Sequence, residues 1–380
     1  MKRILKIGMD VHSTNYTLCA MEPVIGAEDR VFANVQVTPD YKNIILFIEN
    51  LKQKLGLNDT YDIECGYEAG CLGYSLYNQL TSAGVKCVIL APTTMLTEQG
   101  QRIKTDSRDA HLIAQCLSYG GYHPVYIPTE QDDSVKEYLR MRDDHKKALK
   151  KIKQVILAFI LRCGKKYDGD TYWTIRHIKW LYDLELSESL KLILDEYLDT
   201  YNKLIDKLER LDEKILNISN SSRYKEDTDK LNCLKGITKQ SALTIISEIG
   251  DFKRFGTPNE LCSYLGLVPG ERSSAGKGPR LGITKLGNKV VRTQLVESAQ
   301  ALIKGAPGYK SKRLRTKQQG QNIKVISYCD RASERLMHRY RHLIFSGLHH
   351  NKAITAIARE LACFIWGIMN NKLDERVIGG

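Results

Sequence analysis

The chain has 380 residues, 42% hydrophobic and 27% charged, a composition typical of folded globular proteins that excludes global disorder. Its nine prolines and 28 glycines exclude a collagen-like or proline-rich chain, and its length predicts two or three domains. Lysine and arginine number 57 against 44 acidic residues, so the net charge of +13 favours a polyanionic partner, either nucleic acid or an acidic membrane surface.

The ten cysteines are scattered and form no C-x-x-C pair, which argues against a zinc ribbon and against a secreted disulfide framework. The first residues lack the apolar core of a signal peptide. No run approaches the roughly 20 apolar residues of a membrane span. We therefore expect a reducing cytoplasm and no membrane partner.

Residues 1–125 alternate strand and helix signals. Strands are predicted at Arg3–Val11, Thr17–Met21, Arg30–Val37, Tyr61–Tyr67 and Lys86–Ala91, and helices at Tyr41–Leu55 and Tyr74–Ala83. An order of three strands, helix, strand, helix and strand predicts a mixed α/β sheet.

Residues 133–218 carry a different, helical pattern. Apolar residues recur at spacings of three and four, which predicts the seam of a coiled coil, at Leu190, Leu194, Tyr197, Tyr201, Leu204, Leu208, Leu211, Ile215 and Ile218. The seam fits a helical hairpin within the chain and a dimerisation arm equally well.

Residues 231–370 are predicted to be mostly helical. Leu234–Thr238 resembles the turn of a helix-hairpin-helix, in which backbone N–H groups face a phosphate, although Thr238 replaces the usual second glycine. Residues 271–342 hold 17 basic and 4 acidic residues, which favours phosphate contacts. The basic residues expected to contact nucleic acid are Arg272, Lys277, Arg280, Lys285, Lys310, Lys312, Arg313, Arg315 and Lys317.

Four carboxylates stand at the ends of predicted elements. Asp10 ends the first strand, Glu68 follows the fourth, and Asp106 and Asp109 open a helix with a spacing that places both on one face. If they converge at about 5 Å, each pair repels by about 3 kcal/mol at an effective dielectric near 20, so the pocket requires divalent cations such as Mg²⁺. Taken singly, Asp106 fits a helix N-cap, Asp109 a first-turn acid and Glu68 a surface residue. Their order matches the RNase H-like layout.

Ser273 and Ser274 lie in a glycine-rich loop among bases, where one of them is a candidate nucleophile. The alternative is a phosphate-binding loop in which the serines only donate hydrogen bonds. Residues Ile7–Thr14 also resemble the first phosphate loop of actin-like ATPases, but no second phosphate loop follows.

The combination of motifs resembles the DEDD-type insertion-sequence transposases, the Piv/MooV-related group of insertion sequence 110. The motifs that carry the resemblance are Gly8–His12, Tyr67–Tyr74, Lys104–Ala110, Leu265–Ser274, Gly282–Asn288, Arg292–Ala299 and Ala356–Leu361. The resemblance implies a RuvC-like, RNase H-like domain at residues 1–128, a coiled-coil helical arm at 129–225, and a mainly α-helical C-terminal transposase domain with the hairpin at 226–380.

The same resemblance implies a chemistry. Asp10, Glu68, Asp106 and Asp109 are expected to bind Mg²⁺, with Mn²⁺ as a substitute, and a serine is expected to attack a DNA phosphate, as in a serine recombinase. By its offset from Pro269 this is Ser274, with Ser273 in reserve; Ala275 departs from the usual Ser-Gly pair.

The family further implies donor and target DNA, a guide (bridge) RNA, a homo-oligomer that is a dimer or tetramer, and the nucleoid-associated cytoplasm of a bacterial or archaeal cell. Three alternative functions remain: a hydrolytic Holliday-junction-type nuclease that uses only the four acids, an actin-like ATPase scaffold, and a non-catalytic nucleic-acid-binding protein.

Overall fold

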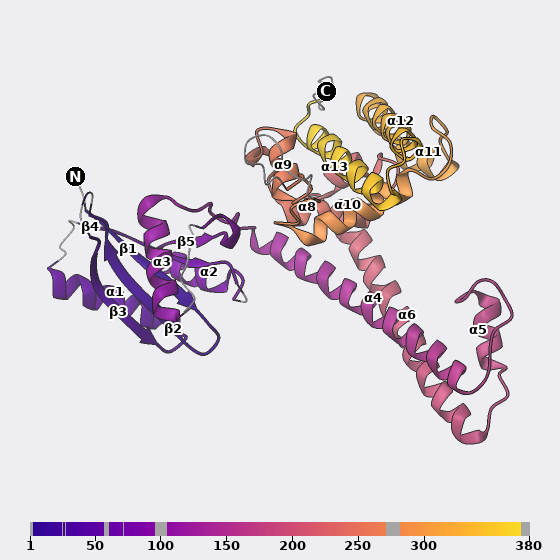
Figure 1. Ribbon diagram of the computed structural model, residues 1–380, viewed down its shortest axis with the longest axis horizontal. Coiled ribbons are helices and arrows are strands. Elements are labelled where there is room, and N and C mark those ends of the chain that lie inside the picture. The colour runs from indigo at the N-terminus through magenta and orange to yellow at the C-terminus, as the bar shows by residue number, and fades with distance from the viewer. Residues whose placement is uncertain are drawn as a thin grey trace. The chain divides into compact units, whose positions relative to one another are not determined.

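The chain is described by a computed structural model that covers residues 3–24, 26, 28–56, 61–70, 72–95, 105–270 and 282–373. It divides into two compact units, residues 1–127 and residues 128–380 (Figure 1). In the described part of the chain, no helix combines the length and the apolar character that a membrane span requires.

The first unit is built on a five-stranded mixed sheet in the order β3-β2-β1-β4-β5. Strands β1 (Arg3–Val11), β2 (Tyr16–Glu22) and β3 (Arg30–Val37) pair antiparallel, whereas β4 (Tyr61–Glu68) and β5 (Lys86–Leu90) extend the sheet in parallel beyond β1. The predicted α/β sheet is thus confirmed.

Helices cover both faces of this sheet. Helices α1 (Tyr41–Leu55) and α2 (Ser75–Ser82) pack on the face that carries the buried Leu5, Ile7 and Met9 of β1. Helix α3 (Asp106–Tyr119) packs on the other face, against Cys19 and Met21 of β2. A short 3₁₀ turn, η1 (Pro92–Thr94), follows β5.

The second unit begins with two long helices, α4 (Glu130–Arg162) and α6 (Glu188–Ser219), joined through the short α5 (Ile175–Tyr182). The start of α4 packs with Ile215 near the end of α6, and the end of α4 packs with Leu194 near its start, so the helices are antiparallel. An ion pair joins Arg142 Nε to Asp212 Oδ1 at 2.8 Å. The apolar seam therefore packs within the chain, as in a helical hairpin.

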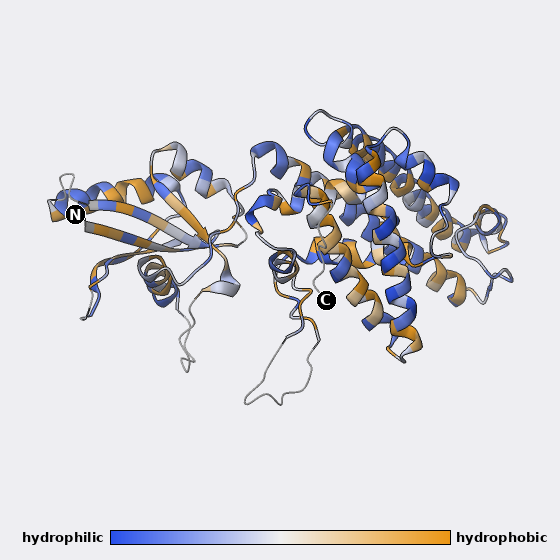
Figure 2. Cartoon of the chain, turned by 90° about the horizontal axis from the view of Figure 1, so that it is seen from above, coloured by the Kyte–Doolittle hydropathy of each residue, from blue (hydrophilic) through white to orange (hydrophobic). Residues whose placement is uncertain are grey.

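Most of the remaining helices share one hydrophobic core. They are α7 (Lys225–Asn232), α8 (Lys239–Ile249), α9 (Pro258–Tyr264), α10 (Lys289–Leu302), α12 (Ile323–Phe345) and α13 (His350–Met369), with a 3₁₀ turn η2 (Phe252–Arg254), whereas the short α11 (Lys312–Gln318) lies outside that core. Helix α13 is buried along most of its length, while α12 buries one side. Hydrophobic and hydrophilic residues alternate along many of the helices (Figure 2).

The turn between α7 and α8 contains the predicted hairpin glycine. Gly236 has φ +89°, and a Cβ there would lie 2.3 Å from the Ser298 carbonyl oxygen of α10. Only glycine therefore allows this turn to rest on α10. The N-cap of α8 is Thr238, whose side chain accepts a hydrogen bond from the Ser241 amide.

Candidate active site

The candidate site lies where α3 begins, beside the end of β1. On β1, Gly8 and Asp10 lie on the face that α3 covers, since side chains alternate along a strand. A Cβ on Gly8 would lie 2.1 Å from the Ala110 carbonyl oxygen and 2.3 Å from the Ala114 amide nitrogen. The missing side chain at Gly8 thus allows the backbone of α3 to lie directly on the strand that carries Asp10.

The first turn of α3 contains the two acids that the sequence singled out. Thr105 is the N-cap, with its side chain accepting from the Arg108 amide, so the interpretation of Asp106 as the N-cap is wrong. Asp106 and Asp109 follow in the first turn, where carboxylates are favoured by the helix dipole. The Asn34 amide of β3 donates to Ser107 Oγ at 2.7 Å and fastens this end of the helix to the sheet.

Asp10, His12 and Asp106 form one group, in which one ligand atom of each residue lies within 4.8 Å of the others. His12 Nε2 is 3.3 Å from Asp10 Oδ2. The Asn15 side-chain amide donates to Asp106 Oδ2 at 3.5 Å, which is a weak contact. The turn between β1 and β2 thus supplies a polar side chain to each carboxylate.

The electrostatics of Asp10 favour a cation. Burial raises the pKa of its carboxyl, His12 lowers it, and the charges of Asp109 and Asp106 raise it further. Asp10 Oδ2 is buried and has no hydrogen bond of normal geometry among the described residues. A buried carboxylate oxygen that faces like charges, with the imidazole of His12 near it, fits a divalent metal ion, which prefers oxygen ligands.

Glu68 lies at the same edge of the sheet but outside that group. It is the last residue of β4, one position beyond the pair of Met9 with Tyr67, and its side chain is exposed. The structure therefore brings Asp10 and Asp106 together and holds Asp109 close enough to act on Asp10. Sequence reasoning missed His12, although its position two residues after Asp10, directly beyond the end of β1, was the available signal.

The serine loop has its two ends side by side. Ser273 and Ser274, with Arg272, Lys277 and Arg280, lie outside the described residues. On either side, Pro269 bridges Ile283, the Gly270 amide donates to the Gly282 carbonyl at 2.8 Å, and the Thr284 amide donates to the Val268 carbonyl at 2.9 Å. The loop therefore leaves from and returns to one short paired stem.

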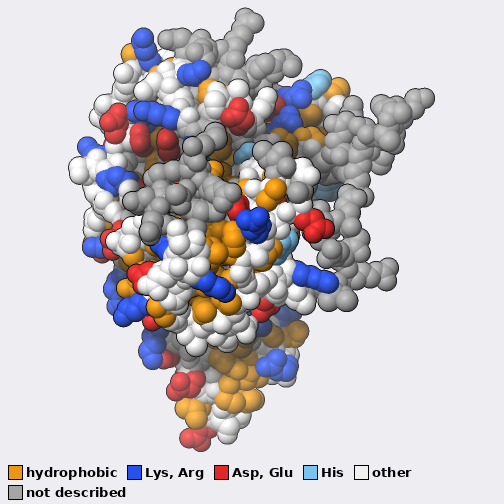
Figure 3. Space-filling model, turned by 90° about the vertical axis from the view of Figure 1, so that its left-hand side faces the viewer, with side chains coloured by type: hydrophobic (Ala, Val, Ile, Leu, Met, Phe, Trp, Pro, Cys, Tyr) orange, Lys and Arg blue, Asp and Glu red, His pale blue; other side chains and the backbone are white. Residues whose placement is uncertain are grey.

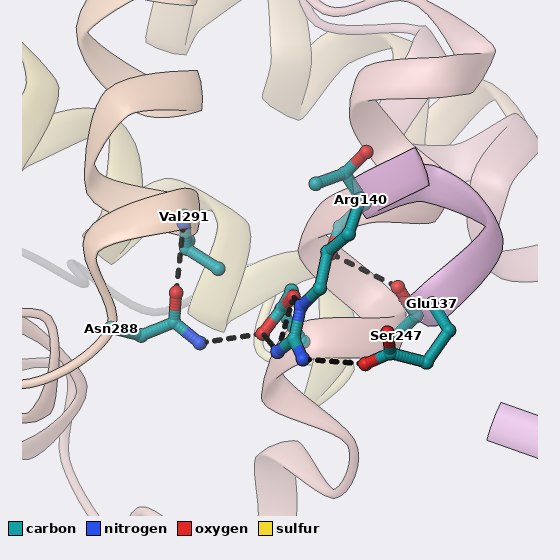
Figure 4. A network of polar contacts seen from close by, with 7 residues as sticks. Glu137, Arg140, Ser247, Asn288 and Val291 are labelled. Carbon is teal, nitrogen blue, oxygen red and sulfur yellow. Dashed lines mark hydrogen bonds and ion pairs between the residues drawn. The ribbon is translucent and has the colours of Figure 1, made fainter. Parts of the chain in front are cut away.

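A buried glutamate anchors the helix that follows this stem. Asn288 caps α10 by accepting from the Val291 amide, and its side-chain amide donates to Glu248 Oε2 of α8 at 2.8 Å. Arg140 of α4 donates to Glu248 Oε1 at 3.2 Å and to Glu137 at 2.7 Å (Figure 4). Glu248 thereby connects the long helix α4 with the start of α10.

The basic residues predicted to contact nucleic acid differ in their surroundings. Lys310 is ion-paired with Asp330, and Lys317 donates to the Ile237 carbonyl in the hairpin turn. Burial, with a smaller effect of Arg313, lowers the pKa of Lys317 to about 8. Lys285 is exposed after the stem, and the exposed bases of α11 are Lys312, Arg313 and Arg315. On the face of the molecule in Figure 3, basic and acidic side chains are interspersed.

Two family models match the chain. Residues 7–163 match a transposase model of the DEDD type for insertion sequence 110, and residues 228–314 match a model described as transposase of the IS116/IS110/IS902 family. The transposase for insertion sequence element IS1533 of Leptospira borgpetersenii is 30% identical over 352 residues, which cover 90% of this chain and 97% of the relative. The chain belongs to the IS116/IS110/IS902 family of transposases.

Other relatives carry the same kind of name. "Putative transposase y4qE" of Sinorhizobium fredii is 34% identical over 311 residues, covering 80% of this chain and 74% of that protein. The transposase for insertion sequence element IS1111A of Coxiella burnetii is 25% identical over 204 residues, covering 53% and 55%. A DEDD transposase domain implies a divalent metal and an enzyme that cleaves and transfers DNA, and the mixed sheet of the first unit fits an RNase H-like fold.

Proposed function

We propose that this transposase cleaves and rejoins DNA with a Mg²⁺ centre held by Asp10, Glu68, Asp106 and Asp109 and with a serine nucleophile. The observation that carries the proposal is the meeting of Asp10 and Asp106, residues 96 positions apart in sequence, around a buried Asp10 oxygen that has no hydrogen bond of normal geometry among the described residues. Such a meeting of acids has a cost in repulsion that a bound cation removes.

Each acid has a defined part in this centre. Asp10 offers the buried oxygen, Asp106 and Asp109 approach it from one turn of α3, and Glu68 stands at the neighbouring strand end. These carboxylates would hold a divalent ion, Mg²⁺ or its substitute Mn²⁺, which would polarise the scissile phosphate and stabilise charge on its oxygens. The strand and helix ends keep the carboxylates in place before DNA arrives.

The nucleophile in this proposal is Ser274, with Ser273 in reserve. Its Oγ bonds to the phosphorus as the bond from phosphorus to one ester oxygen of the DNA breaks. The hydroxyl proton of the serine passes to solvent, the leaving oxygen takes up a proton, and the phosphoserine link keeps the bond energy for rejoining. The basic residues of the loop and of α11 would hold the phosphates. The short stem at Pro269 and Ile283 and the cap at Asn288 support the ends of this loop.

The proposed partners are nucleic acids and further copies of the chain. We propose a guide (bridge) RNA alongside donor and target DNA, and a dimer or tetramer in which the acids of one subunit meet the serine of another. The basic window at residues 271–342 supports a nucleic-acid surface. The domain boundaries at residues 128 and 225, the RuvC-like character of the first domain and the nucleoid-associated cytoplasmic location remain part of this proposal.

The proposal is tested by trapping the protein on labelled DNA with Mg²⁺, with and without candidate RNA, and mapping the attached residue by mass spectrometry. Wild type is expected to form an adduct at Ser274, and Ser274→Ala is expected to lose both the adduct and strand transfer. Ser273→Ala is the matched control. Continued cutting by Ser274→Ala without transfer would instead identify a hydrolytic nuclease.

A further inference from the structure

Beside the four acids, the turn between β1 and β2 carries a histidine, His12. The His12 amide donates to the Asn15 carbonyl at 2.9 Å, which closes a tight turn directly after Asp10. This bond fixes the backbone of His12 relative to the strand. The local turn therefore places the imidazole of His12 beside the carboxylates of Asp10 and Asp106.

The imidazole faces the acidic group. Its Nε2 lies 3.3 Å from Asp10 Oδ2, and this is the only polar contact that the structure records for the His12 side chain among the described residues. Half of the side chain is exposed, so the ring has room to turn. If His12 only formed an ion pair with Asp10, no positive charge would lie between the carboxylates of Asp10 and Asp106.

The distances fit a shared ion. Two atoms bound to one ion at about 2.1 Å lie about 3 Å apart when adjacent and about 4.2 Å apart when opposite. The Asp10, His12 and Asp106 ligand atoms lie within 4.8 Å of one another, so shifts under about 1 Å bring all three onto one ion.

We propose that His12 is a nitrogen ligand of this centre, which raises its affinity for the substitute ion Mn²⁺ more than its affinity for Mg²⁺. The inference rests on the proposed metal centre and adds a ligand that the four acids do not include. First-row divalent metals, Mn²⁺ included, accept an imidazole nitrogen as a ligand, whereas Mg²⁺ prefers oxygen and keeps its water ligands. Removing the imidazole should therefore weaken Mn²⁺ binding much more than Mg²⁺ binding.

The direct test is electron spin-echo spectroscopy of Mn²⁺ bound to the full-length protein, which detects a coordinated imidazole nitrogen. Wild type is expected to show the ¹⁴N modulation and His12→Gln to lose it, while His338→Gln, an exposed histidine on α12, keeps it. Calorimetric titration should show Mn²⁺ affinity falling about tenfold or more in His12→Gln, with Mg²⁺ affinity changed less than about twofold.

The outcomes separate the inference from the proposal beneath it. Mn²⁺ that binds in an Asp10-dependent way without the nitrogen signal, or with a signal that survives His12→Gln, overturns the role of His12 and leaves the acidic centre standing. Mn²⁺ binding that is absent, or unchanged in Asp10→Asn, overturns the acidic centre and the inference together.

Discussion

Gly8→Ala is the substitution that most directly tests the packing on which the acidic site depends. The new Cβ would lie 2.1 Å from a carbonyl oxygen and 2.3 Å from an amide nitrogen of α3, whereas ordinary contacts begin at about 3.4 Å. Both atoms belong to the helix backbone and no rotamer change relieves the overlap, so α3 must retreat by more than about 1 Å.

The expected consequences are measurable separately. Overpacking of this kind reduces the free energy of unfolding by about 1–3 kcal/mol, visible as a lower urea midpoint. Because α3 carries Asp106, the retreat also separates it from Asp10, and Mn²⁺ affinity measured by calorimetry should fall about tenfold.

A matched control is available in the same unit. Gly70→Ala places its Cβ no closer than 3.8 Å to its nearest neighbour, so it should leave the urea midpoint close to that of wild type. Wild-type stability and Mn²⁺ affinity in Gly8→Ala would refute the claim that contact between α3 and β1 assembles the site.

Three further predictions concern the second unit. Glu248→Ala removes the buried acceptor of Arg140 and Asn288, while Arg140 stays half-exposed and paired with Glu137, so the free energy of unfolding should fall by about 1–2 kcal/mol in chemical denaturation. An unchanged midpoint would contradict the anchoring role of Glu248. Burial raises the pKa of Asp132, but hydrogen bonds from Arg223, Tyr224 and Thr129 outweigh this effect and lower the pKa below its usual value. The Asp132 carboxylate therefore stabilises the fold above pH about 4, and this contribution disappears as the pH falls through the lowered folded-state pKa. Asp132→Asn should flatten the pH dependence of the melting temperature, and equal slopes in wild type and variant would contradict this role. The three exposed bases of α11 are Lys312, Arg313 and Arg315. Replacing all three by alanine should make the slope of log K for DNA binding against log salt concentration shallower by about 3, measured by fluorescence anisotropy. An unchanged slope would show that these bases make no phosphate contacts.

The sheet could be predicted because its strands are signalled locally. β1 and β3 have the predicted bounds, and β2 extends one residue further at each end than Thr17–Met21. The acids at Asp106 and Asp109 were predictable for the same reason, since a spacing of three on one helix is a local rule.

What the sequence could not supply are contacts between distant segments. The close approach of Gly8 to Ala110 and the bond from Arg140 to Glu248 join residues about 100 positions apart, and no local pattern signals either. For Lys310, the sequence indicated a free base for nucleic acid, but tertiary packing places Asp330 against it. The partner of a charged side chain depends on how helices pack, and this information is not local.

A metal ion held by the ends of β1, β4 and α3 can be located by replacing Mg²⁺ with Fe²⁺ and adding hydrogen peroxide and ascorbate. The bound Fe²⁺ reduces the peroxide to hydroxyl radicals, which cut the chain near the ion, and ascorbate restores Fe²⁺. We expect cuts near Asp10, Glu68 and Asp106, all of which disappear in Asp10→Asn. Cuts that map elsewhere, or that persist in Asp10→Asn, would contradict this metal site.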